Sequence, residues 1–298
     1  MNKKEKHINK AQVTDTIGIR QNTEYALLLL KAQRKLYNKA KNLKKIKVLL
    51  AVVSFLGAVA VLPFWPEYKI YFALFGGVVT ALNSLWLNDT EQKLINQAAR
   101  IQEEFDVFVL GLPDNKSLTE YPVTKEVIYH YGADESDNGL KNWYPDLEDM
   151  EPSKAALIAQ RSNLVWDWRQ REVFANWLAW STIILLLAGI VYGVAWGLSL
   201  QDYLLMVLLP TLPFLILGYS SVRKHRKVLE RQQLKEKEIN ALLASRTSIS
   251  QETLRSIQDA IYKNRRESAM IPNFVYRWLR KKFQKEMEVS ADSIKNTK

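Results

Sequence analysis

The 298-residue sequence contains no cysteine and only three histidines, His7, His130 and His225, which stand far apart. Without cysteine the chain has no disulfide and no thiolate metal site, and the histidines lack the HExxH or comparable spacing of a zinc site. The GxSxG elbow, the GKS or GKT phosphate loop and the GxGxxG turn are also absent. The sequence therefore supports none of the enzyme classes that these motifs mark, and we expect neither a metal nor a cofactor.

These absences still allow an enzyme whose catalytic site consists of carboxylates. Asp106, Asp146 and Asp167 lie on separate segments, and acids from separate segments can converge on one site. The alternative, which we favour, is that these carboxylates form structural salt bridges with Arg161 or Arg171.

Charged side chains are almost absent from four long apolar runs, although the whole chain has a mean hydropathy of only −0.18 and a formal charge of +11. The runs cover residues 48–65, 70–87, 174–201 and 203–219. A helix of about 20 apolar residues crosses roughly 30 Å of hydrocarbon. We therefore predict four transmembrane helices, joined as two hairpins. Because the runs contain no ionisable side chain other than tyrosine, an active transporter is disfavoured.

The third run belongs to one unbroken helix, predicted over residues 153–200. No glycine or proline interrupts its polar first half. The polar residues of that half recur at three- and four-residue steps, which places them on one helical face: Gln160, Asn163, Asp167 and Arg171. The helix thus carries a cytosolic site into the membrane.

Small residues and prolines mark the second hairpin. Gly189, Gly193 and Gly197 form a stripe along which another helix approaches closely, either within one subunit or in an oligomer. Pro210 and Pro213 remove backbone hydrogen bonds from the fourth span, so we expect a kink there. Two interpretations stay open: the kink gates an apolar pore that is closed by dewetting, or the prolines are tolerated by neighbouring helices.

Basic residues are concentrated in the leader and the tail, whereas residues 88–172 are acidic. The basic segments either pack against the acidic region in the same compartment or attract anionic lipid head groups. DNA or RNA is a weaker candidate, because no nucleic-acid-binding pattern accompanies the charge. The positive-inside rule places both termini in the cytoplasm, and the polar leader predicts no secretory signal.

These features predict a mainly α-helical integral membrane protein with five regions. Residues 1–47 form a cytosolic basic helix, residues 48–87 the first transmembrane hairpin, and residues 88–173 a cytosolic α-rich insert. Residues 174–219 form the second hairpin, and residues 220–298 form a basic helical cytosolic tail.

Local patterns define elements inside the insert and the tail. Residues 105–110 are apolar and β-rich and precede the turn signals of GLPDN, so we expect a strand-like segment. In the tail we expect helices at residues 226–244, 251–268 and 273–288. The last is basic and amphipathic, and either lies on the inner leaflet or packs on the acidic insert.

Several segments, in their order and spacing, resemble the SMODS-associating four-transmembrane effector family of bacterial cyclic-oligonucleotide antiphage signalling (CBASS). They are IRQNTEYALLLLKAQRKLYNKAK, FDVFVLGLPDN, KNWYPD, QRSNLVWDWRQR and IQDAIYKNRR, and the resemblance spans nearly the whole chain. It implies a pore-forming effector of the bacterial inner membrane, encoded beside a nucleotidyltransferase whose cyclic product signals phage infection. Activation then damages the membrane and causes growth arrest or death.

The resemblance makes a cyclic oligonucleotide the expected signal. Two interpretations of the aromatic and basic residues stay open. In the first, bases of the ligand stack on the rings of Trp143 and Tyr144 while its phosphates bind Arg161 or Arg171. In the second, these residues only hold the insert against the long helix. The candidate residues for ligand sensing or coupling are Trp143, Tyr144, Asp146, Gln160, Arg161, Asn163, Asp167 and Arg171.

We expect the chain to act as a homo-oligomer that opens or disrupts the bilayer. Two other classes of function compete with this one. The first is a membrane-bound enzyme that acts on lipid or nucleotide through the polar seam of the long helix. The second is a non-catalytic scaffold or channel accessory protein, which by itself causes no leakage from vesicles.

Overall fold

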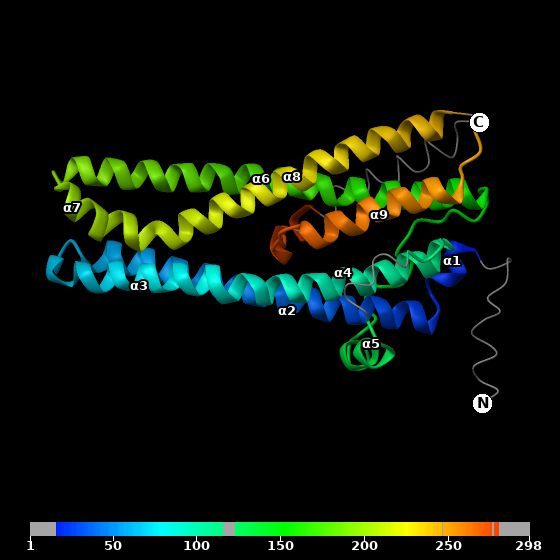
Figure 1. Cartoon of the computed structure of the whole chain (residues 1–298), viewed down its shortest axis with the longest axis horizontal. Coiled ribbons are helices and arrows are strands. Elements are labelled where there is room, and N and C mark those ends of the chain that lie inside the picture. Colours follow the sequence, from blue (N-terminus) through cyan, green and yellow to red (C-terminus); the bar gives the residue numbers. More distant parts are fainter. Residues whose placement is uncertain (1–15, 116–122, 246, 276, 280–298) are drawn as a thin grey trace.

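The computed structural model describes residues 16–115, 123–245, 247–275 and 277–279, and the regular structure of these residues is helical. Long helical runs lie side by side along the length of the molecule (Figure 1). Two of them are single helices, α2 (Glu24–Val61) and α6 (Pro152–Ala195). The other two each consist of three consecutive elements. One is α3 (Lys69–Leu82), the π-helical η3 (Asn83–Leu87) and α4 (Asn88–Leu110), and the other is α7 (Leu200–Tyr203), the π-helical η5 (Leu204–Leu208) and α8 (Leu209–Ala244). The shorter helices are α1 (Ile17–Arg20), η2 (Pro66–Tyr68), α5 (Lys125–Gly132) and α9 (Gln251–Glu267).

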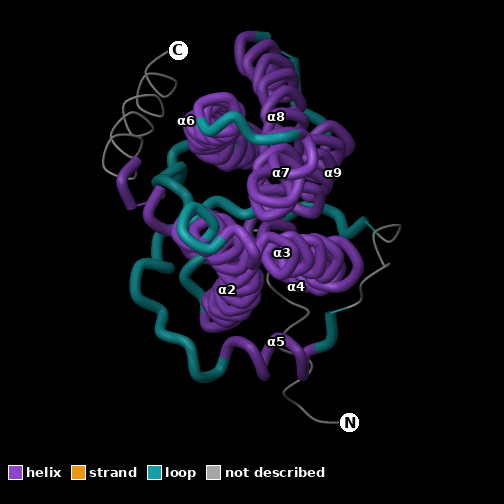
Figure 2. The backbone as a smooth tube through the Cα atoms, turned by 90° about the vertical axis from the view of Figure 1, so that its left-hand side faces the viewer, coloured by secondary structure: helices purple, strands orange, loops and turns teal. Residues whose placement is uncertain are grey.

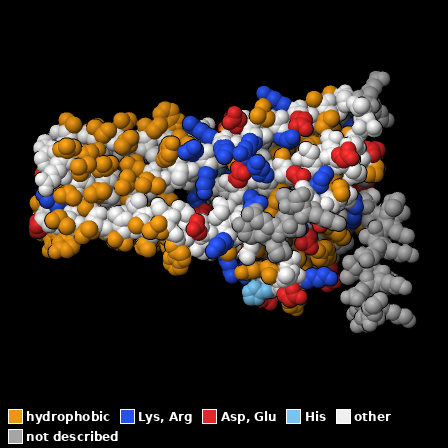
Figure 3. Space-filling view, in the orientation of Figure 1, with side chains coloured by type: hydrophobic (Ala, Val, Ile, Leu, Met, Phe, Trp, Pro, Cys, Tyr) orange, Lys and Arg blue, Asp and Glu red, His pale blue; other side chains and the backbone are white. Residues whose placement is uncertain are grey.

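One half of the molecule has an apolar surface. Figure 3 shows hydrophobic side chains covering the left-hand half, and charged side chains over the other half. Large apolar residues are exposed in the apolar half, with Leu85 79% and Val194 77% accessible. An apolar surface this extensive marks a membrane-facing region, so the predicted mainly α-helical membrane fold is confirmed.

Among the residues that the structure describes, three helical runs are long and apolar enough to cross a membrane: Pro66–Leu110, Pro152–Ala195 and Leu200–Ala244. The first predicted span lies in α2, which ends at Val61. Its apolar part is helical over residues 48–61, about 21 Å at 1.5 Å per residue. The remaining residues of that run belong to the turn around Pro63, because proline cannot donate a backbone hydrogen bond.

Two tight turns close the hairpins at the far end of the apolar half (Figure 1). The first turn contains η2 and joins α2 to α3. In the second, Gly197 adopts a left-handed φ of 59°, and the Leu198 N–H donates to the Gly193 carbonyl at 3.0 Å. This is the glycine-dependent way of ending a helix. Lys69 and Asp202 form an ion pair of 2.5 Å that joins the two turns.

The unbroken third helix is present as α6, which is about 66 Å long at 1.5 Å per residue. Pro152 occupies its first turn, and the Glu151 carboxylate accepts hydrogen bonds from the N–H groups of Ser153 and Lys154 at 3.1 and 2.9 Å. Proline fits the first turn because its missing donor has no helical partner there. The helix ends at Ala195, before the predicted residue 200, because of the Gly197 turn.

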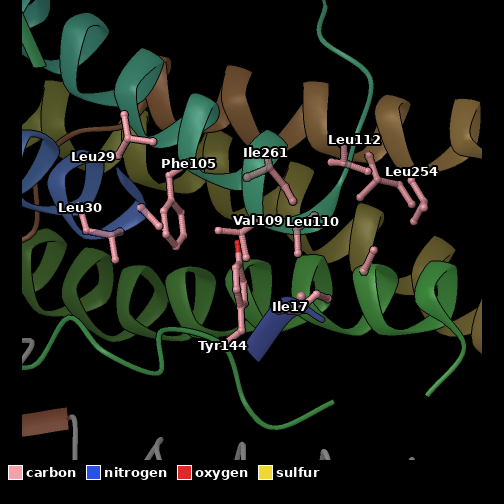
Figure 4. Close-up of a cluster of buried hydrophobic side chains, with 14 of the residues drawn as sticks. Ile17, Leu29, Leu30, Phe105, Val109, Leu110, Leu112, Tyr144, Leu254 and Ile261 are labelled. Atoms are coloured by element: carbon pink, nitrogen blue, oxygen red, sulfur yellow. The ribbon is translucent and has the colours of Figure 1, made fainter. Parts of the chain in front are cut away.

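The other half of the molecule has a hydrophobic core built from α2, α4, α6, α9 and the loop before α6. Figure 4 shows Phe105, Val109 and Ile261 meeting Leu29 and Tyr144 in this core. Figure 2 shows α5 outside the long helices, where it packs against α2. Helix α9 contacts α4, α6 and α8, so it ties both hairpins together.

Two local expectations change with the structure. The strand-like segment predicted at residues 105–110 is wrong: these residues are the last turns of α4, which Gly111 ends with a φ of 68°. The helical spacing of Ile101, Phe105 and Val109, all fully buried, outweighs the β propensity of the individual residues. The turn at GLPDN is confirmed.

The tail helices also differ in extent. The helix predicted at 226–244 is the end of α8, which continues without interruption from the fourth span. The helix predicted at 251–268 is confirmed as α9. Most of the third predicted tail helix, residues 273–288, lies outside the described residues.

Candidate functional site

The Asp106 carboxylate, on α4, is a meeting point of four segments and is fully buried. Its Oδ1 accepts a hydrogen bond from the hydroxyl of Tyr144 at 2.7 Å, and that hydroxyl accepts one from the Asn163 amide at 2.9 Å. Its Oδ2 accepts from Gln258 at 2.9 Å and from Arg265 at 2.5 Å. The Asp106 carboxylate therefore joins α4 directly to α9 and to the loop before α6, and reaches α6 through the Tyr144 hydroxyl.

The buried charge of Asp106 is stabilised because each of its oxygens accepts hydrogen bonds and one of them is paired with Arg265. Burying a charge is costly unless it is paired and hydrogen-bonded. Burial lowers the pKa of Arg265, but Asp106 outweighs that effect and holds the pKa above its usual value. Burial and then the charge of Asp106 raise the pKa of Tyr144 well above its usual value, so its hydroxyl stays a donor.

Glu103 lies about one turn before Asp106 and extends the cluster toward the start of α4. It is 1% exposed and is paired with Arg255, while Gln258 donates to its Oε2 at 2.8 Å. Burial raises the pKa of Glu103, and Arg255 opposes that shift. Arg255 also donates to the Pro113 carbonyl at 3.2 Å, which fixes the turn after α4 on α9.

The polar face of α6 reaches two other helices. The fully buried Gln160 donates to the Leu254 carbonyl at 2.9 Å and to Gln258 at 3.2 Å, which joins α6 to α9. The next residue, Arg161, forms an ion pair of 3.1 Å with Glu236 of α8. The polar half of α6 is thus bonded on one side to α9, and on the other to α8.

A second cluster surrounds Arg171, close to the start of the span. Its guanidinium forms two bonds with Asp167, at 2.6 and 2.9 Å, in the paired geometry that suits arginine and carboxylate. Gln232 of α8 donates to the same carboxylate at 2.7 Å. Arg171 also donates to the Ala269 carbonyl at 3.0 Å, which anchors the segment after α9.

His225 of α8 completes the second cluster. It is fully buried, and its Nδ1 lies 3.2 Å from Nη1 of Arg171. Arginine has only donors, so Nδ1 is the acceptor. Burial, followed by the charges of Arg171 and Lys44, lowers the pKa of His225 well below its usual value. The imidazole of His225 is therefore neutral where α6, α8 and the segment after α9 meet.

In the apolar half of the molecule, α2 and α3 contact α8 closely at the prolines of α8. Pro213 has no N–H and so leaves the Leu209 carbonyl without its helical donor. Gly76 of α3 packs directly on that carbonyl, since a Cβ at Gly76 would lie 2.3 Å from its oxygen. The fully buried Ser54 of α2 donates to the Pro210 carbonyl at 2.8 Å. Neighbouring helices thus accommodate the prolines, and Figure 1 shows a bend in the run near them.

Comparison with known proteins agrees with this architecture. A family model described as the SMODS-associating 4TM effector domain matches residues 15–294. The chain belongs to the SMODS-associating 4TM effector family. It is 26% identical over 288 residues to a protein of Bacillus cereus (strain VD146) named "Probable CBASS effector molecule", and the match covers 92% of this chain and 96% of that one. No solved structure matches the chain.

The sensing candidates of this 4TM effector fall into two groups. Tyr144, Gln160 and Asn163 join the Asp106 cluster, and Asp167 and Arg171 form the cluster around His225. Of the remaining three, Arg161 lies in its own ion pair with α8, Asp146 accepts from the Glu148 N–H at 3.1 Å, and Trp143 is 38% exposed.

The glycine stripe of this 4TM effector lies against its own chain. Added Cβ atoms at Gly189 and Gly193 would lie 3.1 Å from Val207 and 2.6 Å from Tyr203. Both contacts are made within the second hairpin, between α6 and the run leading into α8. Gly197 has no atom within 4 Å of an added Cβ, and its role is to end α6.

Sequence reasoning missed the partners that α9 contributes to the 4TM effector site. Gln258 and Arg265 bind Asp106, and Arg255 binds Glu103. Gln258 and Arg265 both lie in IQDAIYKNRR, one of the segments that carry the family resemblance. The family resemblance of that segment indicated that it is important, but its residue spacing does not predict which residue, more than 150 positions away, each side chain contacts.

Proposed function

We propose that this family member is a pore-forming effector of CBASS, whose activation disrupts the bacterial inner membrane. The observation that carries the proposal is α6, one 44-residue helix. Its cytosolic half is bonded to the insert, α8 and α9, whereas its other half is apolar and faces lipid. A displacement of the cytosolic half moves the span, since no break separates the two. The name of the Bacillus cereus relative supports the same role.

The proposed orientation has both termini, the insert and the tail in the cytoplasm. Support comes from the positive charges at the boundary of the apolar half, which Figure 3 shows as a blue zone. Lys44 and Lys47 precede the first span, and Arg223 and Lys224 follow the fourth. Cytoplasmic flanks of spans carry such an excess of lysine and arginine.

The proposed signal is a cyclic oligonucleotide made by a CBASS nucleotidyltransferase. Within the candidate set, Trp143 is suited to direct stacking, because 38% of its surface is exposed and its ring packs edge-on against Phe105 at 6.2 Å. Tyr144 follows it directly and binds Asp106. A ligand on Trp143 would therefore move Tyr144, and the bonds of the Tyr144 hydroxyl to Asp106 and Asn163 would transmit that movement to α4 and α6.

We also propose that the effector acts as a homo-oligomer and without catalysis. In the span of α6, Ile184 and Val191 are 63% and 65% exposed, and they offer an apolar face for lipid or for a second copy. Two carboxylates of the candidate catalytic set support a structural role, because Asp167 is paired with Arg171, as expected, and Asp106 is paired with Arg265.

The test is membrane depolarisation in bacteria that express the protein alone or together with a CBASS nucleotidyltransferase. We expect depolarisation and growth arrest only with the nucleotidyltransferase. Gly193→Leu should reduce both, because it separates α6 from Tyr203, while Gly77→Leu is the matched control since no atom lies within 4 Å of an added Cβ at Gly77. Normal growth and polarisation, with the protein inserted and the nucleotide present, would instead favour a scaffold or accessory protein.

A further inference from the structure

A small cavity of about 30 Å³ lies where three of the helical runs leave the membrane on the cytosolic side. Lys44 and Lys47 line it from α2, and Glu91 from the start of α4. Ser221 and Lys224 line it from α8, just beyond the fourth span, and the segment after α9 closes it. The cavity thus sits between the membrane half and the clusters that surround Asp106 and Arg171.

The charges around this cavity do not balance. Lys47 is neutralised by Glu91 at 2.7 Å and also donates to Asn88 at 2.6 Å. Lys44 donates to the Met270 carbonyl at 2.9 Å. Among the residues that the structure describes, neither Lys44 nor Lys224 has a carboxylate within ion-pair distance. Two positive charges therefore face the same small space without a counterion.

The environment of Lys44 reflects this imbalance. Burial lowers the pKa of Lys44 to about 8, and the charges of Lys47, Lys224 and Arg171 add to that shift, while Glu91 opposes it. Placing like charges near a partly desolvated ammonium is unfavourable. A bound anion would remove the penalty, and the Ser221 hydroxyl, which has no hydrogen-bond partner in the described part of the chain, is available as a donor.

We propose that this cavity binds the phosphate group of an anionic ligand through Lys44, Lys224 and the hydroxyl of Ser221. One buried water needs about 10–15 Å³ by this measure, so the space admits the oxygens of one phosphate group rather than a nucleobase. At the cytosolic boundary of the bilayer the phosphate comes from an anionic phospholipid head group or from a soluble phosphodiester such as a cyclic oligonucleotide.

Such a site would act on the same segment as the Arg171 cluster. Lys44 holds the Met270 carbonyl, and Arg171 holds the adjacent carbonyl of Ala269. A phosphate that attracts Lys44 competes with its bond to Met270. Occupancy of the cavity would thus alter how the end of α9 is tied to α2 and α6. The binding claim itself does not require that the protein form a pore.

The test compares the melting temperature of the purified full-length protein in zwitterionic detergent with short-chain phosphatidylglycerol, short-chain phosphatidylcholine, or a panel of cyclic di- and trinucleotides. A ligand that binds only the folded state raises the melting temperature. We expect phosphatidylglycerol or a cyclic nucleotide, but not phosphatidylcholine, to do so. Lys44→Gln/Lys224→Gln should weaken the apparent affinity by about tenfold or more, as expected for losing charge-assisted hydrogen bonds.

The matched control is Lys45→Gln/Lys227→Gln, which removes the same charge from two exposed lysines that do not line the cavity. It should keep the response of the unmodified protein. If the double cavity variant does not fold, Lys224→Gln alone is used, because that side chain is exposed. The proposal is overturned if no probe raises the melting temperature, or if the cavity and control variants lose the response equally. The probe that responds identifies the source of the phosphate.

Discussion

Asp106 Oδ2 and Arg265 Nη1 lie 2.5 Å apart and form an ion pair between α4 and α9, in which the carboxylate is fully buried and the arginine side chain is 13% exposed. The two residues are 159 positions apart in the chain. The pair joins the helix that continues from the first hairpin to the helix that follows the second, so it bears directly on whether the two hairpins move together.

Removing one partner of this pair should be strongly destabilising. Arg265→Met leaves the Asp106 carboxylate buried without its cation, which typically costs about 3–5 kcal/mol. Thermal unfolding of the purified protein in detergent measures the loss. Lys263→Met, which removes an exposed charge from the same helix, should change the stability by less than about 0.5 kcal/mol.

Replacing both partners should recover much of that loss, because an apolar pair of similar volume leaves no unpaired charge. Asp106→Leu/Arg265→Met is therefore expected to be more stable than Arg265→Met alone. A double variant as unstable as the sum of the two single variants would contradict a direct interaction between these residues.

The Tyr144 hydroxyl should matter separately from its ring. Tyr144→Phe keeps the packing on Phe105 but deprives Asp106 of a donor and Asn163 of an acceptor, at a cost of about 1–3 kcal/mol. Tyr129→Phe on α5 is the control, since that ring is 66% exposed. Equal melting temperatures for the two variants would argue against the hydroxyl as a structural link.

The contact between α3 and α8 makes a prediction for the membrane half. Gly76→Ala places a methyl group 2.3 Å from the Leu209 carbonyl oxygen, and overpacking of this kind costs about 1–3 kcal/mol. Gly77→Ala meets no atom within 4 Å and should be neutral or slightly stabilising. Thermal unfolding in detergent distinguishes the two. A neutral Gly76→Ala variant would show that the helices do not approach this closely.

The buried His225 predicts a pH dependence of stability. Its pKa in the folded chain lies well below the usual value of about 6.5. As the pH falls below about 6.5, the unfolded chain therefore binds a proton that the folded chain does not. Stability contributed by this residue is present above that pH and is lost on acidification.

His225→Gln is the variant that isolates this effect, because glutamine does not titrate. We expect its melting temperature to fall less than that of the unmodified protein between pH 7.5 and 5. His130→Gln, at a histidine on the exposed surface of α5, should leave the pH dependence unchanged. Parallel pH curves for the unmodified protein and His225→Gln would exclude His225 as the titrating group.

Much of the fold follows from local sequence patterns. The apolar runs and the polar seam of α6 depend on periodicity and charge within single helices, and the structure contains them. The segment at residues 105–110 was predicted wrongly because its β-rich composition was weighed without the helical spacing that Phe105 and Val109 share with Ile101. The structure shows that the helical spacing prevails, because all three side chains are fully buried on one face of α4.

The candidate site was less predictable than the fold. The seam of Gln160, Asn163 and Asp167 was visible as a helical face, but its partners Gln258 and Gln232 come from other helices. Pairing between distant segments depends on how the two hairpins pack, which no single-segment pattern encodes. The resemblance of IQDAIYKNRR marked the right helix, and only the structure shows that Arg265 of this segment pairs with Asp106.

The most direct test of the central claim is dye release from liposomes that contain only the purified full-length protein. The liposomes are exposed in turn to a set of cyclic di- and trinucleotides, and protease protection verifies that the protein is inserted in the bilayer. We predict release that depends on one class of cyclic nucleotide and that is reduced in Tyr144→Phe, because the link from the insert to α6 is weakened. Correctly inserted protein that releases no dye with any nucleotide would contradict a directly gated, membrane-disrupting effector.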